Sequence, residues 1–209
     1  MARYTDADCR LCRRYGAKLY LKGNKCFTPR CPFAKRNERP PGDKLPRRRK
    51  VSDRGLQLRE KQKARFAYGV MEAQFRRYYD RAIRMSGRTG ENLVRLLETR
   101  LDNTVYRLGL ADSRDQARQL VRHGHVAVSG RKLNIPSAQV KVGDAIGWTE
   151  RGVRSAFYKD RLAVIESKSV PHWLDLDRQT LTGRVVALPE RGDGDTTFDE
   201  NVIVEYYSR

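Results

Sequence analysis

The chain has 209 residues, and 44 Lys+Arg against 25 Asp+Glu give it a formal net charge of +19. A charge excess of this size indicates a polyanionic partner. The mean hydropathy of −0.76, with no apolar run near the roughly 20 residues that span a bilayer, argues against a membrane protein. Because the first residues contain no apolar stretch, we expect no secretory signal and a reducing compartment, which disfavours disulfides.

The positive charge is concentrated in the first half of the chain. Residues 1–50 contain 16 basic and 4 acidic residues, and residues 51–100 contain 12 and 6, so the first hundred residues carry 18 of the 19 net charges. We therefore expect the N-terminal half to lie deepest in a nucleic acid and the acidic C-terminal part to face solvent or protein.

All four cysteines fall in one short segment, as Cys9-x2-Cys12 and Cys26-x4-Cys31. Two such pairs can converge on one tetrahedral metal ion, and four thiolates suit either zinc or an iron–sulfur cluster. The spacing does not decide between these two, and four unligated cysteines are the third alternative. We expect zinc, in a closed structural site that holds the surrounding basic side chains against phosphate: Arg3, Arg10, Arg13, Arg14, Lys18, Lys22 and Lys25.

A basic linker follows the cysteine segment. Its prolines and the Arg39-Pro-Pro-Gly-Asp stretch cannot form a regular element. The run Arg47, Arg48, Arg49 and Lys50 is predicted to bind RNA. Between residues 52 and 85, apolar residues in a field of charge predict short helices, with breaks at Gly69 and Gly87. The aromatic residues of these helices could stack on bases, but their helical spacing favours core packing.

Two further helices are predicted from apolar periodicity and end signals. Residues 91–108 follow a three-four apolar spacing, with Gly109 at the C-terminal cap position. Ser113 and Gln116 form the pattern of a capping box, which opens a helix that Gly124 closes.

The second of these helices carries a stripe of arginines. Arg114, Arg118 and Arg122 recur every four residues and therefore lie on one side of the helix. A solvated charged face is the alternative interpretation. A phosphate-binding face is favoured because more basic and stacking side chains follow immediately: His123, His125, Arg131 and Lys132.

After Gly124 the apolar period changes to two, which predicts a small antiparallel sheet. The expected strands lie near residues 126–128, 133–135, 140–142 and 146–148, and further strand-like patches occur at 162–165, 185–188 and 202–206.

No sequence motif of a phosphate loop, dinucleotide-binding loop, zinc protease or serine hydrolase is present, and the chain has only three histidines. We therefore expect a protein that is not an enzyme and has no small-molecule substrate. An RNA-modifying enzyme with the same binding module and a zinc-ribbon regulator are the competing classes.

The stretch from Glu98-Thr-Arg-Leu-Asp-Asn to Arg122-His-Gly-His-Val-Ala-Val-Ser-Gly resembles the RNA-binding alpha-L module named after ribosomal protein S-four. The four-cysteine segment, the Pro-Pro-Gly linker, Leu58-Arg-Glu-Lys-Gln-Lys, Val142-Gly-Asp and the ending Glu205-Tyr-Tyr-Ser-Arg extend the resemblance to the whole bacterial family. Two departures are Pro-Gly-Asp-Lys-Leu, where members often have Pro-Gly-Gln-His-Gly, and Val-Ser-Gly, where they have Val-Asn-Gly.

This resemblance implies a cytoplasmic protein of the small ribosomal subunit that binds 16S ribosomal RNA early and nucleates assembly of the subunit body. It also implies contact with ribosomal protein S-five, in an interface linked to translational accuracy, and a position near messenger RNA where it enters the subunit. Some members repress their own messenger, and some lack the cysteines.

Carried over by position, the resemblance assigns the metal ligands to Cys9, Cys12, Cys26 and Cys31 and the module's RNA-facing residues to Ser113, Arg114, Gln116, Arg118, Gln119, Arg122, His123, His125, Arg131 and Lys132. The expected fold class is α+β. Residues 1–45 would form the metal-bound segment and linker, residues 46–97 with 187–209 a helical domain, and residues 98–186 an inserted alpha-L and sheet domain.

Overall fold

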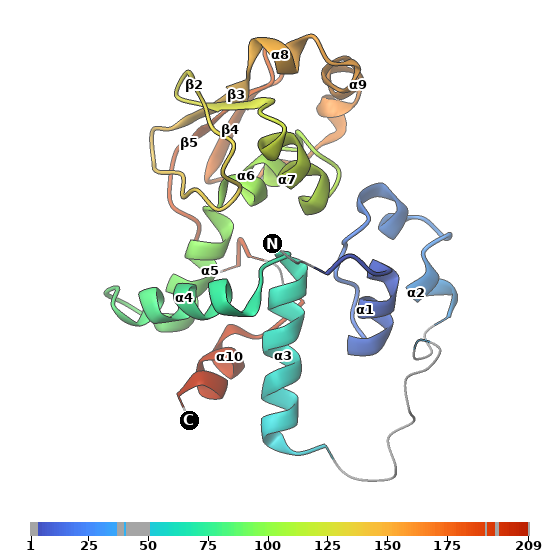
Figure 1. The fold of residues 1–209 in the computed structure, drawn as a ribbon, viewed down its shortest axis with the longest axis vertical. Coiled ribbons are helices and arrows are strands. Elements are labelled where there is room, and N and C mark those ends of the chain that lie inside the picture. Colours follow the sequence, from blue (N-terminus) through green and yellow to red (C-terminus); the bar gives the residue numbers. More distant parts are fainter. Residues whose placement is uncertain (1–3, 37–39, 41–50, 191, 195–196, 209) are drawn as a thin grey trace. The chain divides into compact units, whose positions relative to one another are not determined.

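Helices and one antiparallel sheet make up the chain in a computed structural model that describes residues 4–36, 40, 51–190, 192–194 and 197–208. The chain divides into two compact units, which are Met1–Val94 with Asp195–Arg209, and Arg95–Gly194 (Figure 1). The mixed α+β class is confirmed, whereas the three-part division predicted from the sequence stays a prediction. Among the described residues, no helix has the length and apolar character needed to cross a membrane.

The first unit begins with the cysteine segment, which has a small apolar core of its own. Leu11, Cys12 and Leu19 are buried there. Phe66 packs against this core, with its ring centroid 5.5 Å from that of Tyr4. The elements of the segment are α1 (Asp8–Tyr15), the 3-10 helix η1 (Gly23–Phe27) and α2 (Pro32–Lys35).

The predicted helices of the 52–85 region are confirmed as α3 (Asp53–Ala67) and α4 (Glu72–Ile83). Ser52 caps α3 by accepting a hydrogen bond from the Gly55 amide. The expected core packing of the aromatic residues is also confirmed, because the side chains of Tyr68, Phe75, Tyr78 and Tyr79 are buried.

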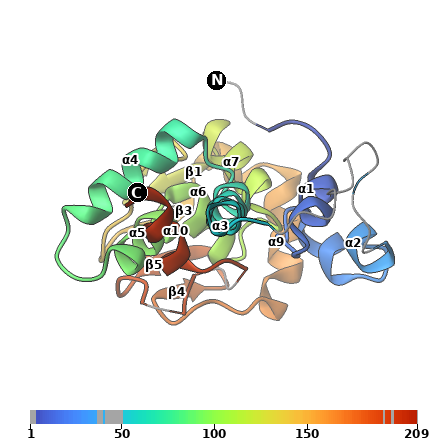
Figure 2. The same cartoon turned by 90° about the horizontal axis from the view of Figure 1, so that it is seen from below.

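The C-terminal helix α10 (Glu200–Tyr207) lies beside α3, as both ribbon views show (Figures 1 and 2). The strand predicted at residues 202–206 from its β-branched residues is therefore wrong. Asp199 accepts a hydrogen bond from the Asn201 amide at the start of the helix, and Ile203 is completely buried. Packing of one apolar face thus outweighs the weak strand preference of Val and Ile.

The single helix predicted over residues 91–108 is also wrong, because two helices occupy this stretch. They are α5 (Thr89–Glu98) and α6 (Leu101–Arg107). Between them, the backbone of Arg100 is extended and pairs with Gln139, and the Leu101 amide donates to the Ala138 carbonyl at 2.8 Å. This tertiary pairing separates α5 from α6, although apolar residues recur with a helical period through both.

Helix α7 (Arg114–Arg122) matches the predicted second helix. Ser113 caps it by accepting a hydrogen bond from the Gln116 amide, and Gly124 follows it with a φ of +73°. The reciprocal half of the predicted capping box differs, since the Gln116 side chain accepts from the Asp112 amide, at 2.8 Å, one residue before the cap.

The sheet of the second unit has five strands in the order β2-β1-β3-β5-β4, with every neighbouring pair antiparallel. Its strands are β1 (Val126–Val128), β2 (Arg131–Lys132), β3 (Ala145–Trp148), β4 (Leu174–Asp177) and β5 (Thr182–Val185). The hairpin turn has positive φ at both Ser129 and Gly130, as a two-residue turn of type I′ requires. A strand was not expected at β4, and the strands expected at 133–135 and 140–142 do not form.

The stretch 162–165, predicted as a strand, lies instead in α9 (Ala156–Val164) and the 3-10 helix η2 (Ile165–Ser167), which follow the short α8 (Glu150–Val153). Ser155 caps α9 by accepting from the Tyr158 amide. The patch predicted at 185–188 contributes only Val185 to a strand.

Helix α6 packs on the sheet at a glycine. A Cβ atom added to Gly183 of β5 would lie 2.3 Å from Cδ2 of Leu108. Leu108 is completely buried, in a core that also contains Val121, Ile146 and Trp173. This close approach sets the distance of α6, and of α7 beside it, from the sheet.

Candidate nucleic-acid interface

The three arginines predicted to line one side of α7 differ in how firmly they are held. Arg114 and Arg118 are half-buried, and Arg122 is exposed. The stripe is therefore not a uniformly solvated face. Its first two members rest on the second unit's core and its third reaches into solvent.

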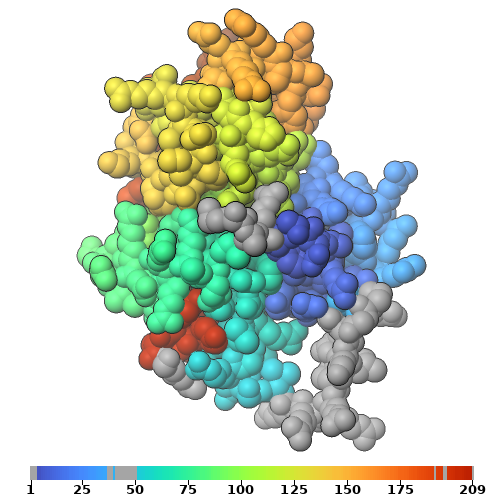
Figure 3. Space-filling view, viewed as in Figure 1, coloured from blue at the N-terminus to red at the C-terminus, as the bar shows by residue number. Residues whose placement is uncertain are grey.

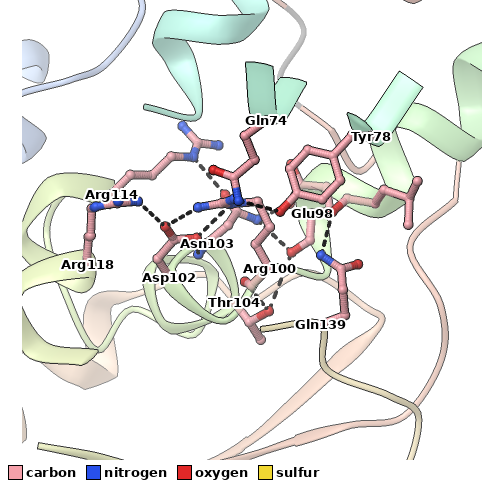
Figure 4. Close-up of polar contacts among 11 residues, drawn as sticks. Gln74, Tyr78, Glu98, Arg100, Asp102, Asn103, Thr104, Arg114, Arg118 and Gln139 are labelled. Atoms are coloured by element: carbon pink, nitrogen blue, oxygen red, sulfur yellow. Dashed lines mark hydrogen bonds and ion pairs between the residues drawn. The ribbon is translucent and has the colours of Figure 1, made fainter. Parts of the chain in front are cut away.

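Arg114 is fixed by contacts with α6 (Figure 4). Its Nε donates to Oδ1 of Asn103 at 2.7 Å, and its guanidinium lies over the Tyr106 ring, 4.7 Å from the ring centroid. A guanidinium stacked on an aromatic face keeps donors in its plane for an anionic ligand.

Arg118 is fixed by a buried carboxylate. Its Nη1 lies 3.3 Å from Oδ2 of Asp102, and only 5% of the Asp102 side chain is exposed. The same carboxylate binds the completely buried guanidinium of Arg100, at 2.6 and 3.0 Å (Figure 4). Glu98, also buried, holds Arg107 through two hydrogen bonds of 2.7 and 2.9 Å. Carboxylates under the surface thus set the directions of guanidiniums at the surface.

The C-terminal end of α7 and the β1–β2 hairpin form one basic area, as predicted. A Cβ atom added to Gly124 would lie 2.3 Å from Cε of Lys132, so the Lys132 side chain crosses directly over this glycine. Arg131, which precedes Lys132, and His123, which precedes Gly124, are also exposed. On the face shown in Figure 3, the hairpin (yellow) lies beside α7 (yellow-green).

His125 is the half-buried member of this area, and its ring centroid lies 6.3 Å from that of His123. Burial lowers the pKa of His125, and the charges of Arg151, His123 and Lys132 lower it further. The neutral ring is therefore favoured in the free protein, because protonation would add a positive charge beside these cations.

Two of the predicted RNA-facing residues stabilise the start of α7. Ser113 and Gln116 use side-chain oxygens to cap the helix, whereas Gln119 is exposed. Capping leaves the hydroxyl proton of Ser113 and the amide NH₂ of Gln116 as donors toward a ligand.

In the cysteine segment, the predicted Arg10, Arg14 and Lys22 are exposed and Arg13 is half-buried. Arg10, Arg13 and Arg14 lie on α1, and Lys22 directly precedes η1. Arg3, Arg47, Arg48, Arg49 and Lys50 lie outside the described residues. The structure also shows an exposed aromatic side chain here that the sequence analysis missed, because Phe27 is 69% exposed and stacks on Tyr20.

The four cysteines form no disulfide, and only Cys9 is not fully buried. The Cys12 sulfur accepts from the Leu19 amide at 3.5 Å, and the Cys26 sulfur accepts from the Lys22 amide at 3.4 Å. Burial raises the pKa of Cys12 to about 11. Among the described residues, no group of three or more His, Cys, Asp or Glu side chains is arranged to hold a metal ion. The structure thus does not confirm the predicted metal-bound segment.

Sequence reasoning missed the residues that position the arginines. Asp102 and Asn103 lie on α6, 16 and 11 residues from Arg118 and Arg114. Their one signal is a pair of polar residues inside an apolar periodic stretch, and both prove to be buried.

The capped basic helix, the basic hairpin and the sheet behind them define the class as a nucleic-acid-binding α+β protein. Residues 3–98 match the family model of the ribosomal protein S4/S9 N-terminal domain, and residues 99–146 match that of the S4 domain.

Relatives match along the whole chain. Over 209 residues, and over the full length of both proteins, the chain is 54% identical to the small ribosomal subunit protein uS4 of Heliobacterium modesticaldum. The identity is 55% with protein uS4A of Alkaliphilus metalliredigens and 53% with protein uS4 of Dictyoglomus turgidum, again over both full lengths. The chain therefore belongs to the ribosomal protein S4 family, which is a family of ribosomal structural proteins and not of enzymes.

Proposed function

We propose that this protein is a cytoplasmic structural component of the small ribosomal subunit that binds 16S ribosomal RNA directly and nucleates assembly of the subunit body. The observation that carries the proposal is the arginine stripe of α7, in which α6 fixes Arg114 and Arg118 and which Lys132 continues across Gly124. Guanidiniums held in set directions match phosphates in a folded RNA better than mobile ones do.

The side chains on this surface favour RNA structure over RNA sequence. Arg and Lys donors bind phosphate oxygens, which every nucleotide has, so selectivity has to come from the shape in which the phosphates are presented. A junction of RNA helices presents such a shape, and an isolated duplex does not.

The test is binding of the full chain to deproteinised 16S ribosomal RNA, with chemical footprinting of the complex. We expect low-nanomolar affinity, protection confined to one helical junction and a steep fall of affinity with salt. An arbitrary RNA duplex of equal length is the matched competitor. Equal binding of both RNAs would contradict the proposal.

We also propose a contact with ribosomal protein S-five that supports translational accuracy. Its support is the family membership together with the charge balance, since the acidic residues concentrated toward the C-terminal end leave part of the protein unsuited to RNA. Cross-linking within assembled subunits would test this contact, and absence of cross-links to that protein would contradict it.

We further propose that the cysteine segment binds zinc. The donor set supports this, because Cys9, Cys12, Cys26 and Cys31 lie in one 23-residue stretch and four thiolates suit a closed tetrahedral zinc site. Binding would require the sulfurs to close to coordination distance. Elemental analysis of the purified protein should give one zinc per chain and a colourless solution. Brown colour would indicate an iron–sulfur cluster, and absence of both metals would contradict the proposal.

A further inference from the structure

We infer that Asp102 is a positioning residue for RNA binding: its buried carboxylate fixes the guanidinium of Arg118 in the direction in which it meets a phosphate. The inference rests on the proposed function, since it concerns how the α7 surface holds RNA.

The geometry around Asp102 uses its whole hydrogen-bonding capacity. Oδ1 accepts from Nε of Arg100 at 3.0 Å and from the Asn103 amide at 2.9 Å. Oδ2 accepts from Nη2 of Arg100 at 2.6 Å and from Nη1 of Arg118 at 3.3 Å (Figure 4). The carboxylate can neither rotate nor move without breaking one of these hydrogen bonds.

The two arginines that bind the Asp102 carboxylate differ in burial and in hydrogen-bond length. Arg100 is completely buried and donates the shortest hydrogen bond, so it needs the negative charge of Asp102 for its own neutralisation. Arg118 is 19% exposed and donates the longest one. One carboxylate therefore faces two guanidiniums, and the charge of Arg118 is left available to an anion outside the protein.

The donors of Arg118 are also incompletely used. In the described part of the chain, its Nε is buried and has no hydrogen-bond partner. This Nε is out of reach of a ligand, so a phosphate oxygen at the α7 surface would bind the exposed part of the guanidinium, in a side chain that is 19% exposed. The ion pair with Asp102 thus restrains the side chain without using up its binding capacity.

A restraint of this kind strengthens binding because ordering a long side chain opposes association. When Asp102 has already ordered Arg118, RNA binding loses less side-chain entropy. Removing the restraint should weaken RNA binding about two- to tenfold, the range expected for one long side chain that must be ordered on binding.

The test is a double-mutant cycle with the full chain and deproteinised 16S ribosomal RNA. Asp102→Asn should weaken binding about two- to tenfold when Arg118 is present, and it should change affinity less than about twofold in the Arg118→Gln background. A loss of affinity caused by general damage to the fold would appear equally in both backgrounds, and that result would overturn the inference.

Asp102→Asn also removes the carboxylate that the buried Arg100 guanidinium binds, so the fold of this variant needs a check. Asp102→Glu keeps that charge but displaces the carboxylate by one methylene, and we expect it to stay folded at 25 °C with a lowered melting temperature while weakening RNA binding in the same Arg118-dependent way. Unchanged binding by a folded Asp102→Glu protein, or an Arg118→Gln variant with normal affinity, would overturn the inference. Failure of the unmodified chain to select 16S ribosomal RNA would instead overturn the proposed function.

Discussion

Arg161 of α9 is held by both carboxylate oxygens of Asp112, at 2.8 and 2.7 Å. Only 8% of the Arg161 side chain is exposed, and Lys168 adds a third ionic interaction with Asp112, at 3.3 Å. Asp112 directly precedes Ser113, the cap of α7, so this ion pair joins the start of the basic helix to α9. The position of the arginine stripe in its unit therefore depends on it.

Asp112→Asn should destabilise the protein by about 2 kcal/mol, because it leaves the Arg161 guanidinium buried with its charge uncompensated. Urea unfolding measures the change. Asp160→Asn removes an exposed carboxylate from the same helix α9 and is the matched control. Equal unfolding midpoints for the two variants would show that the pair contributes nothing to stability.

The same pair predicts a dependence on pH. Burial on its own raises the pKa of Asp112, but the hydrogen bonds and charges of Arg161 and Lys168 lower it overall. A carboxyl group with a lowered pKa stabilises the fold at pH values above its ordinary pKa of 3.8, and this contribution disappears as the pH falls through the folded-state pKa. Between about pH 5 and pH 3, wild type should therefore lose more stability than Asp112→Asn, and parallel pH profiles would refute this.

Gly183→Ala should destabilise the second unit by about 2 kcal/mol, because the new methyl group would overlap the buried Leu108 side chain. Gly147→Ala, on the neighbouring strand, is the control, since its Cβ would lie 3.3 Å from the Thr182 hydroxyl. Adding Leu108→Val to Gly183→Ala should restore part of the stability. Thermal unfolding of the variants measures both effects, and no rescue would mean that the clash is not the cause.

Local signals in the sequence predicted much of this fold. Ser113 and Gly124 marked the ends of α7 correctly because capping depends on side chains and backbone conformations within a few residues. Distant interactions could not be predicted in this way. The helix break at Arg100 follows from pairing with Gln139, and α10 is helical because Ile203 packs in a core.

The same limit applies to the candidate site. The four-residue spacing of Arg114, Arg118 and Arg122 predicts that they share a side of one helix. This spacing contains no information on Asp102, which lies on α6 and orients the Arg118 guanidinium. The basic residues of such a surface can be identified from the sequence of one chain segment. The acidic residues that orient them come from another segment, and only tertiary packing brings the two together.

Replacing Arg118 and Arg122 by alanine should weaken binding to 16S ribosomal RNA about tenfold for each phosphate that loses its arginine, since a charge-assisted hydrogen bond contributes about 1.5 kcal/mol. The slope of log affinity against log salt should become shallower by about one unit per phosphate. Arg178→Ala removes an exposed arginine from the β4–β5 turn and controls for net charge. An unchanged slope for the α7 variants would exclude the stripe from the interface.

His125 should make RNA binding dependent on pH near neutrality. Burial and the neighbouring charges of Arg151, His123 and Lys132 lower its pKa in the free protein, so its contribution to stability is present above the ordinary pKa of 6.5 and disappears as the pH falls through the folded-state value. A phosphate placed among these cations would have the opposite effect and favour the protonated ring.

RNA binding should therefore take up a proton at His125, and affinity should rise as the pH is lowered from about 7.5 to about 6.0. Titration calorimetry in two buffers of different ionisation enthalpy measures the proton uptake directly. His125→Gln should abolish most of it, whereas His172→Gln, at a histidine whose side chain is 63% exposed and beside Asp193, should not. Equal proton uptake by wild type and His125→Gln would mean that no phosphate approaches this ring.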